Sequence, residues 1–164
     1  RIEVQVPEQG LLLDSYPGAL GQTLGHLVQN AVLHGFDGRA HGTVRITGGR
    51  SDGPGEDGRI WLRVADDGRG IAAEHRARVF DPFMTTRLGQ GGTGLGLHIG
   101  QTAVENLLGG SLKLLSTAGE GTCFELRLPP HAPQPQVAGG EAVAVRATLP
   151  AADVVGDVHI GSRR

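Results

Sequence analysis

The feature that most constrains the fold is a glycine-rich run, residues 89–96, that leads directly into a helical pattern. The 28 glycines of the 164-residue chain follow no fixed period, which excludes collagen and solenoid repeats. Other glycines gather in short clusters at 51–58, 109–110 and 119–121. Glycine clusters at element boundaries predict loops whose backbone approaches another group closely.

The run and the helix start read Gly91-Gly92-Thr93-Gly94-Leu95-Gly96-Leu97-His98-Ile99. A glycine loop that opens into an amphipathic helix directs free backbone N–H groups and the positive end of the helix dipole at an anion. It is not a Walker A loop, because no Gly-Lys-Ser/Thr follows, and not a Rossmann turn, because the glycine spacing differs and no βαβ unit surrounds it. The pattern predicts phosphate binding, with a merely tight turn as the alternative.

Hydrophobic periodicity on both sides of this run predicts helices beside antiparallel hairpins. Apolar residues at helical spacing begin after Pro17 and end at His34-Gly35, a second long helix covers 94–108, and 72–79 carries a short helical pattern. Strands are predicted at 1–6, an edge strand, at 43–47 and 60–65, which form a hairpin, and at 111–115 and 122–128, which form another. These elements indicate an α/β fold, a two-layer sandwich with a mixed, mostly antiparallel sheet and helices on one face.

The composition changes after residue 129. Pro129-Pro130, Pro133 and Pro135 precede a stretch of alanine, valine and glycine with little periodicity. We interpret 1–129 as one domain and 130–164 as a linker or poorly ordered tail, in which Ala142–Ala147 predicts a short strand. The abrupt start at Arg1 suggests that the chain is cut from a longer one.

Charge and composition exclude several classes of partner. The formal net charge of −2 gives no basic field of the kind that binds nucleic acid. No apolar run approaches the ~18 residues needed to span a bilayer, so we expect no direct membrane insertion of this domain. The single cysteine, Cys123, excludes an intramolecular disulfide and fits a reducing compartment. We therefore expect a cytoplasmic domain, which leaves open a membrane segment elsewhere in a longer protein.

The first long helix carries a polar stripe formed by His26, Asn30 and His34 at four-residue spacing. The amide oxygen of Asn30 is a ligand type that Mg²⁺ accepts together with waters and substrate phosphates. A solvated polar face is the alternative. A metal held by His26 and His34 together is disfavoured, because eight residues of helix separate them by about 12 Å.

A carboxylate followed by two glycines ends the strand at 60–65, in the sequence Asp66-Asp67-Gly68-Arg69-Gly70. Asp66 at a strand end can accept a hydrogen bond from an exocyclic amine such as that of adenine. A common Asp-Gly turn is the alternative. Thr122, in Gly119-Glu120-Gly121-Thr122, offers a hydroxyl where the last strand begins, although this segment alone indicates only a hairpin.

Between these motifs lies Phe80-Asp81-Pro82-Phe83-Met84-Thr85-Thr86-Arg87. Two phenylalanines beside a polar and then glycine-rich stretch predict either a hydrophobic anchor for a mobile flap or a plain core contact. Arg87 is the best-placed cation for phosphate charge, since Lys113 is the only lysine in the chain.

Taken in order, these motifs resemble the N, G1, F, G2 and G3 boxes of sensor histidine kinases, which are related to gyrase, mismatch-repair and heat-shock-chaperone ATPases. The resemblance covers about Pro17 to Pro129. It implies a Bergerat-type α/β sandwich that binds ATP and Mg²⁺, with Asn30 as the Mg²⁺ ligand, Asp66 as the adenine selector assisted by Thr122, and a short lid at 85–91. The ATP-binding residues that it implies are Asn30, His34, Asp66, Gly68, Gly70, Phe80, Phe83, Arg87, Gly92, Thr93, Gly94, Leu95, Gly96, Leu97 and Thr122, with Phe80 and Phe83 as lid anchors.

Two positions of the first helix depart from the kinase pattern. The chain has His26 where these kinases usually have a second Asn, and Leu33 where a lysine is common. The hydrolytic relatives carry a glutamate at the position of His26, as a general base for water, so its absence favours phosphotransfer over ATP hydrolysis. Because histidine can itself act as a base, this argument is one of degree.

The resemblance implies that the chain donates the γ-phosphoryl group of ATP to a histidine on a separate helical-hairpin phosphoacceptor domain, upstream of a response regulator in a two-component system. None of the seven histidines has the acidic, proline-containing context of such an acceptor; His75, for example, precedes Arg76, and His98 precedes Ile99. We therefore predict that the chain does not phosphorylate itself. An anti-sigma-type serine kinase and a nucleotide-binding regulatory module without catalysis remain as alternatives.

Overall fold

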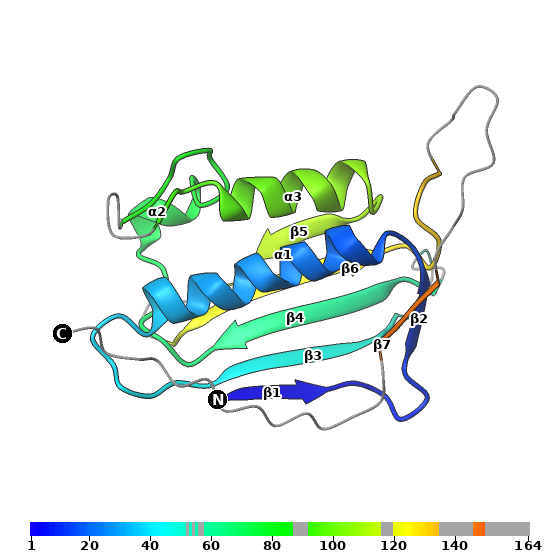
Figure 1. The fold of residues 1–164 in the computed structure, drawn as a ribbon, viewed down its shortest axis with the longest axis horizontal. Coiled ribbons are helices and arrows are strands. Elements are labelled where there is room, and N and C mark those ends of the chain that lie inside the picture. The colour runs from blue at the N-terminus through cyan, green and yellow to red at the C-terminus, as the bar shows by residue number, and fades with distance from the viewer. Residues whose placement is uncertain are drawn as a thin grey trace.

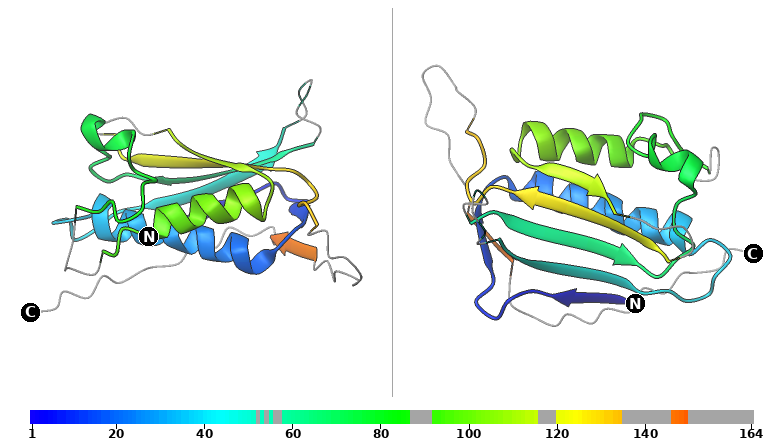
Figure 2. Two further views of the ribbon diagram at one scale, coloured as in Figure 1. Left: turned by 90° about the horizontal axis from the view of Figure 1, so that it is seen from above. Right: turned by 180° about the vertical axis from the view of Figure 1, so that it is seen from behind.

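Two layers make up the fold: a five-stranded sheet and, against one of its faces, the helices α1 (Pro17–Asn30) and α3 (Gly96–Asn106) (Figure 1). The view from above in Figure 2 shows both helices on the same side of the sheet. This computed structural model describes residues 1–51, 53, 55, 58–86, 92–115, 120–134 and 146–149. The predicted two-layer α/β sandwich is confirmed.

The sheet has the strand order β1-β3-β4-β6-β5, in which only the β1–β3 pair is parallel. The predicted edge strand and both predicted hairpins are therefore present. Their bounds are β1 Ile2–Gln5, β3 Val44–Arg50, β4 Ile60–Asp66, β5 Ser111–Leu114 and β6 Thr122–Leu128.

The core lies between the sheet and the two long helices. Alternate apolar residues of the central strands β4 and β6 point to the helices, because side chains of a strand face opposite sides in turn. These residues are directly paired across the strands as Ile60 with Leu128, Leu62 with Leu126 and Val64 with Phe124, and all are buried. The helices supply Leu20 and Leu27 from α1 and Val104 from α3.

Helix α1 begins at Pro17, whose missing N–H is not needed at the first helical position. It continues without a break into a π-helical turn, η1 (Ala31–Gly35), and thus ends at His34-Gly35 as predicted. Helix α3 begins at Gly96 rather than at residue 94, because Gly94 has a left-handed φ of 68° that a right-handed helix does not allow. The predicted helix at 72–79 is reduced to α2, Ala73–Arg76.

Two further strands lie outside the five-stranded sheet, one near the start of the chain and one near its end. β2 (Leu11–Asp14) was not predicted, because three consecutive leucines hide the alternation in which Leu11 and Leu13 are buried and Leu12 is exposed. It pairs antiparallel with β7 (Arg146–Leu149). The strand observed in the tail therefore lies further along the chain than the one predicted at Ala142–Ala147. Residues 142–145 lie outside the described part. Segment 130–132 is also tied to Asp14, through the bonds Asp14 N–H to Pro130 C=O and Ala132 N–H to Asp14 C=O.

Residues 130–132 and 146–149 therefore contact β2, and the interpretation of 130–164 as a linker or poorly ordered tail stays a prediction. The domain boundary at 129 stays a prediction. Within the part of the chain that the structure describes, no helix combines the length and the apolar character that crossing a membrane requires.

Candidate functional site

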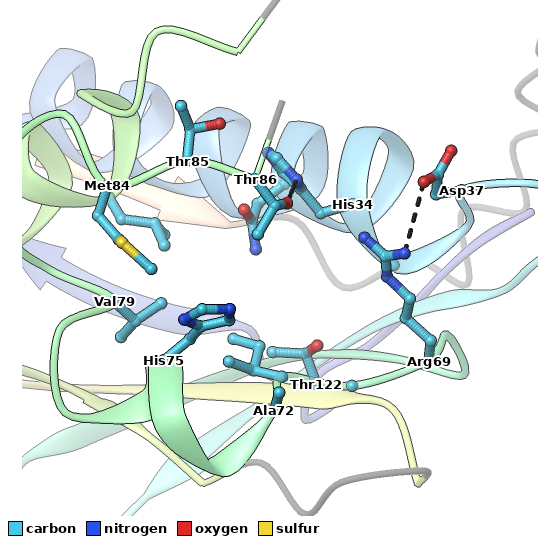
Figure 3. Close-up of a pocket in the computed structure, with 15 residues that line it drawn as sticks. His34, Asp37, Arg69, Ala72, His75, Val79, Met84, Thr85, Thr86 and Thr122 are labelled. Carbon is cyan, nitrogen blue, oxygen red and sulfur yellow. Dashed lines mark hydrogen bonds and ion pairs between the residues drawn. The ribbon is translucent and has the colours of Figure 1, made fainter. Parts of the chain in front are cut away.

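A cavity of about 580 Å³ opens between the end of α1, the loop after β4, helix α2 and the segment around residue 85 (Figure 3). Figure 3 shows Met84, Thr85 and Thr86 on one side of it and Ala72, His75 and Thr122 on the other. The residues that line it are Asn30, His34, Gly35, Asp37, Arg69, Gly70, Ile71, Ala72, His75, Val79, Met84, Thr85, Thr86, Leu97 and Thr122. Five of the predicted ATP-binding residues are among them: Asn30, His34, Gly70, Leu97 and Thr122.

Asp66 ends β4 beside this cavity, behind Thr122 and Gly35. Its Oδ1 atom accepts hydrogen bonds from the backbone N–H of Gly68 at 2.9 Å and of Thr122 at 3.3 Å, which fix the orientation of the carboxylate. Burial raises the pKa of Asp66 above its ordinary value, although the hydrogen bonds from Gly68 and Thr122 oppose this rise. A half-buried carboxylate that the fold orients without neutralising it with a cation is suited to accept a donor from a ligand.

Gly68 is required next to this carboxylate. A Cβ atom at position 68 would lie 2.5 Å from the carbonyl oxygen of Gly35 and 2.6 Å from Oδ1 of Asp66. The tight turn after β4 therefore brings η1 and the Asp66 carboxylate together only when residue 68 has no side chain. This close approach gives a structural reason for one glycine of the Asp-x-Gly-x-Gly motif.

The two polar residues predicted on the first helix lie at its last turns. Asn30 is the final residue of α1 and His34 lies in η1, and both side chains line the cavity. His34 Nδ1 lies 3.1 Å from Thr86 Oγ1, so the helix end contacts the start of the predicted lid. π-Helical turns are rare and occur often at functional sites.

His26, one turn before Asn30, is not among the residues that line the cavity. Its ring packs against the start of α3, where a Cβ atom at Gly96 would lie 3.4 Å from His26 Cγ. The buried Nδ1 atom of His26 has no hydrogen-bond partner among the described residues. The polar stripe of the helix is thus divided between the cavity and the α1–α3 contact.

The glycine-rich motif precedes α3 at the edge of the site. Of its residues only Leu97 lines the cavity, so Gly92, Thr93, Gly94, Leu95 and Gly96 are placed beside it rather than in its wall. Among the described residues no side chain caps the first turn of α3. The first N–H groups of a helix lack intrahelical acceptors, so this end of α3 retains donors for an anion.

The two predicted lid anchors differ. Phe80 is half-buried and packs edge-on against Phe124 of the core, with ring centroids 6.0 Å apart. Phe83 instead is 70% exposed and has a φ of 64°, with its backbone against Gly94. The ring of Phe83 is therefore exposed in this structure, and its role as a lid anchor stays a prediction. Arg87 lies outside the described residues, as does the lid from 87 to 91.

Several residues of the cavity were missed by sequence reasoning. Arg69 and Asp37 form an ion pair of 3.4 Å that joins the loop after β4 to the loop after η1 (Figure 3). His75 and Met84 also present their side chains to the cavity. Arg69 stands inside the Asp-x-Gly-x-Gly motif and could have been considered there, but no local signal pairs it with Asp37.

The comparisons with known proteins agree with this geometry. The family model described as histidine kinase-, DNA gyrase B- and HSP90-like ATPase matches residues 16–132. The two-component sensor PprA of Pseudomonas aeruginosa is 37% identical over 134 residues, which are 80% of this chain and 14% of PprA. The chain therefore spans about one seventh of the length of this relative.

Two solved structures show the same likeness in three dimensions. The catalytic domain of histidine kinase ThkA matches with a TM-score of 0.64 at 26% identity, over 79% of this chain and 81% of ThkA's. Full-length ShkA in complex with AMPPNP matches with a TM-score of 0.59 at 30% identity, over 78% of this chain and 25% of ShkA's. With the family match, the sensor relative and the shared fold in agreement, this chain belongs to the histidine kinase-, DNA gyrase B- and HSP90-like ATPase family, on the sensor histidine kinase side of it.

Proposed function

We propose that the chain binds Mg²⁺-ATP and donates its γ-phosphoryl group to a histidine of a separate phosphoacceptor domain in two-component signalling. The observation that carries this proposal is the Asp66 carboxylate, which two backbone N–H groups orient beside a cavity that Asn30 and Thr122 line. The likeness to ShkA, solved with AMPPNP, and to PprA, a two-component sensor, supports the same reading. Because response regulators and ATP are cytoplasmic, the proposed function places this domain in the cytoplasm.

The cavity suits a purine base. The side chains of Ile71, Val79, Met84 and Leu97 contribute apolar walls to it, and pockets for cofactors combine such walls with a few placed polar groups. Here Thr122 and, behind it, Asp66 are the polar groups. The exocyclic amine of adenine is a donor, so the acceptor oxygens of Asp66 match it, whereas the carbonyl of guanine at the same position would face a carboxylate.

Asn30 and the start of α3 suit Mg²⁺ and phosphate. Among the described residues no three His, Cys, Asp or Glu side chains form a metal cluster, but Mg²⁺ commonly uses one protein oxygen beside phosphates and waters, and Asn30 supplies such an oxygen. When bound, Mg²⁺ would neutralise part of the phosphate charge. The start of α3 offers backbone donors to the remaining charge.

In the proposed reaction the chain's residues position the nucleotide and do not act as a nucleophile. A ring nitrogen of the acceptor histidine forms a bond to the γ-phosphorus while the bond from that phosphorus to the bridging oxygen breaks, and ADP leaves with that oxygen. Asp66 and Thr122 hold the base and Asn30 the phosphate end, so the γ-phosphoryl group is presented in line with its acceptor. His26 stands where hydrolytic family members carry a basic carboxylate, which favours transfer over hydrolysis.

Calorimetric titration with AMPPNP and Mg²⁺ tests the nucleotide site. In Asp66→Asn, Oδ1 can still accept from Gly68 and Thr122, but the amide nitrogen then directs N–H donors at the donor amine of adenine. We expect affinity to fall at least about tenfold, as a desolvated donor left without an acceptor costs about 1–3 kcal/mol. Asp67→Asn is the matched control, because Asp67 is exposed and accepts from Thr43 N–H instead.

Equal affinity of Asp66→Asn and Asp67→Asn would refute the assigned base position. A parallel titration with EDTA in place of Mg²⁺ should weaken binding, and Asn30→Ala should reduce the difference between the two conditions. Absence of binding by the intact chain would refute the proposed function and leave the α/β fold unaffected.

Transfer itself is tested with γ-labelled ATP and an added phosphoacceptor domain from a sensor kinase. Phosphohistidine is labile to acid and stable to base, whereas phosphoserine has the opposite stability. Label on the added domain that acid removes supports histidine kinase activity. Acid-stable label would identify a serine kinase, and nucleotide binding without any transfer would identify a regulatory module.

A further inference from the structure

The face of the sheet that carries no helix has a distinctive set of side chains. Figure 2 shows α1 and α3 on the opposite face. The alternation that points Leu62 and Leu126 inward points their neighbours Trp61, Arg63, Glu125 and Arg127 outward. Lys113 of β5 lies directly opposite Glu125 in the register and is exposed. We call these five residues, Trp61, Arg63, Lys113, Glu125 and Arg127, the basic patch.

One buried carboxylate organises this patch. The side chain of Glu125 is only 6% exposed, and its oxygens lie 2.7 Å from Nε of Arg63 and 2.8 Å from Nε of Arg127. Burial alone would raise the pKa of Glu125, but the hydrogen bonds and charges of Arg127 and Arg63 together hold the pKa below its ordinary value. Glu125 is therefore ionised at neutral pH and holds both arginines in place on the sheet.

The only tryptophan of the chain belongs to this face and not to the core. The guanidinium carbon of Arg63 lies 5.1 Å from the centre of the Trp61 ring, a cation–π contact. The ring also lies over β3, where a Cβ atom at Gly49 would be 2.7 Å from Trp61 Cζ2. A partly exposed tryptophan beside arginines that a buried carboxylate holds in place has the composition of a protein-interaction hot spot.

Cations outnumber carboxylates in the patch. Among the described residues it holds Arg63, Lys113 and Arg127 and the single carboxylate of Glu125, although the whole chain has a net charge of −2. Among the described residues Lys113 forms no ion pair, and Arg63 bonds to Glu125 through Nε. The side chain of Arg63 is 47% exposed, so its guanidinium, which can bind a carboxylate in a two-point manner, is accessible from solvent.

We propose that the basic patch is a docking surface for an acidic polypeptide segment, one that presents several aspartate or glutamate side chains. Carboxylates of the partner would pair with Arg63 and Lys113, and an apolar or backbone portion would lie on Trp61. The net negative charge of the chain and a single aromatic ring on this face argue against a nucleic acid, which needs an extended basic field or a series of stacking rings. This surface lies on the side of the sheet away from α1 and α3, so the proposal does not depend on the nucleotide site.

The test is fluorescence anisotropy of a labelled twelve-residue glutamate-rich peptide titrated with the full chain. We expect binding that weakens as salt rises, and a loss of roughly tenfold in affinity for Arg63→Ala, since hydrogen bonds between charged groups are stronger than those between neutral groups. Lys113→Ala should weaken binding by about threefold, as expected for a more exposed charge pair. Arg78→Ala is the matched control, because Arg78 pairs with Asp81 beyond α2 and should leave affinity unchanged.

Amide chemical-shift mapping of the same complex removes the dependence on any variant. Shifts at outward-facing positions of β4, β5 and β6 support the proposal. No binding of the peptide, equal loss in Arg63→Ala and Arg78→Ala, shifts confined to the helix side, or tighter binding of a single-stranded oligonucleotide of equal charge would each overturn it.

Discussion

At the scale of single residues, the burial of Asp66 favours ligand binding but makes its ionised form less stable. The carboxylate lies behind Thr122, where it can accept a donor from a ligand, but the same burial raises its pKa. A raised pKa in the folded state means that the folded chain binds protons more tightly than the unfolded chain. The contribution of Asp66 to stability is therefore fully present below the unfolded pKa and is lost as pH rises through the raised value.

We accordingly expect Asp66→Asn to be more stable than the parent chain at pH 7, while it loses the nucleotide. The gain should shrink toward zero as pH falls below the ordinary carboxyl range, where the aspartic acid is neutral as well. Urea unfolding at pH 7 and near pH 3.5 measures both values. A variant that is less stable than the parent at pH 7 would contradict the assigned cost of ionisation.

Gly94 provides a second residue-scale prediction. It combines a φ of 68° with a Cβ position 2.5 Å from the Phe83 carbonyl carbon, so Gly94→Ala meets backbone strain and backbone contact together. We expect a loss of about 1–3 kcal/mol in unfolding free energy and weaker nucleotide binding. Gly21→Ala is the matched control: it lies inside α1 with no atom near its Cβ position, so stability should rise by about 0.5–1 kcal/mol. Equal effects of the two changes would contradict this account.

At the scale of elements, the site depends on how helix and strand ends meet. The π-helical turn η1 carries α1 past Asn30 and places His34 beside Thr86, while the end of β4 places Asp66 beside the start of β6. Each contact joins residues that are far apart in sequence. The sheet also holds its own polar cluster, in which Glu125 of β6 links β4 through Arg63.

The link between β4 and β6 gives a pH-dependent prediction. Because the pKa of Glu125 is lowered in the folded state, its contribution to stability is present above the unfolded pKa and is lost as pH falls through the folded value. We expect Glu125→Gln to cost about 1–2 kcal/mol at pH 7, with the difference from the parent chain shrinking in acid. Thermal unfolding at pH 7 and pH 3.5 measures this. Glu74→Gln, at a side chain 78% exposed, should change stability by less than about 0.5 kcal/mol.

At the scale of the whole molecule, the proposed function assigns to this chain the nucleotide-binding part of a phosphotransfer reaction. Incubation of the isolated chain with Mg²⁺ and γ-labelled ATP should give no acid-labile label on the chain, because none of its histidines has an acceptor context. The same chain should label an added acceptor domain. Both results are measured as label on each protein that survives treatment with base and is removed by acid. Phosphohistidine on the isolated chain would refute the prediction.

Most of the strands, the two long helices and part of the site could be predicted from the sequence. Alternation in 60–65 and 122–128 fixed which faces of β4 and β6 are buried, since water excludes apolar side chains whatever the final topology. The spacing of Asn30, Asp66 and the glycine-rich run identified residues that now surround or adjoin one cavity, because the groups needed to bind a nucleotide must be present in the chain before folding brings them together.

Features that depend on distant partners could not be predicted from the sequence. The pairing of β2 with β7, the ion pair of Arg69 with Asp37 and the outward position of Phe83 have no local signal, because each is set by atoms far along the chain or by a backbone conformation forced at a close contact. The basic patch likewise exists only once β4, β5 and β6 are in register. Sequence periodicity specifies which way a side chain faces, whereas strand register specifies its neighbours.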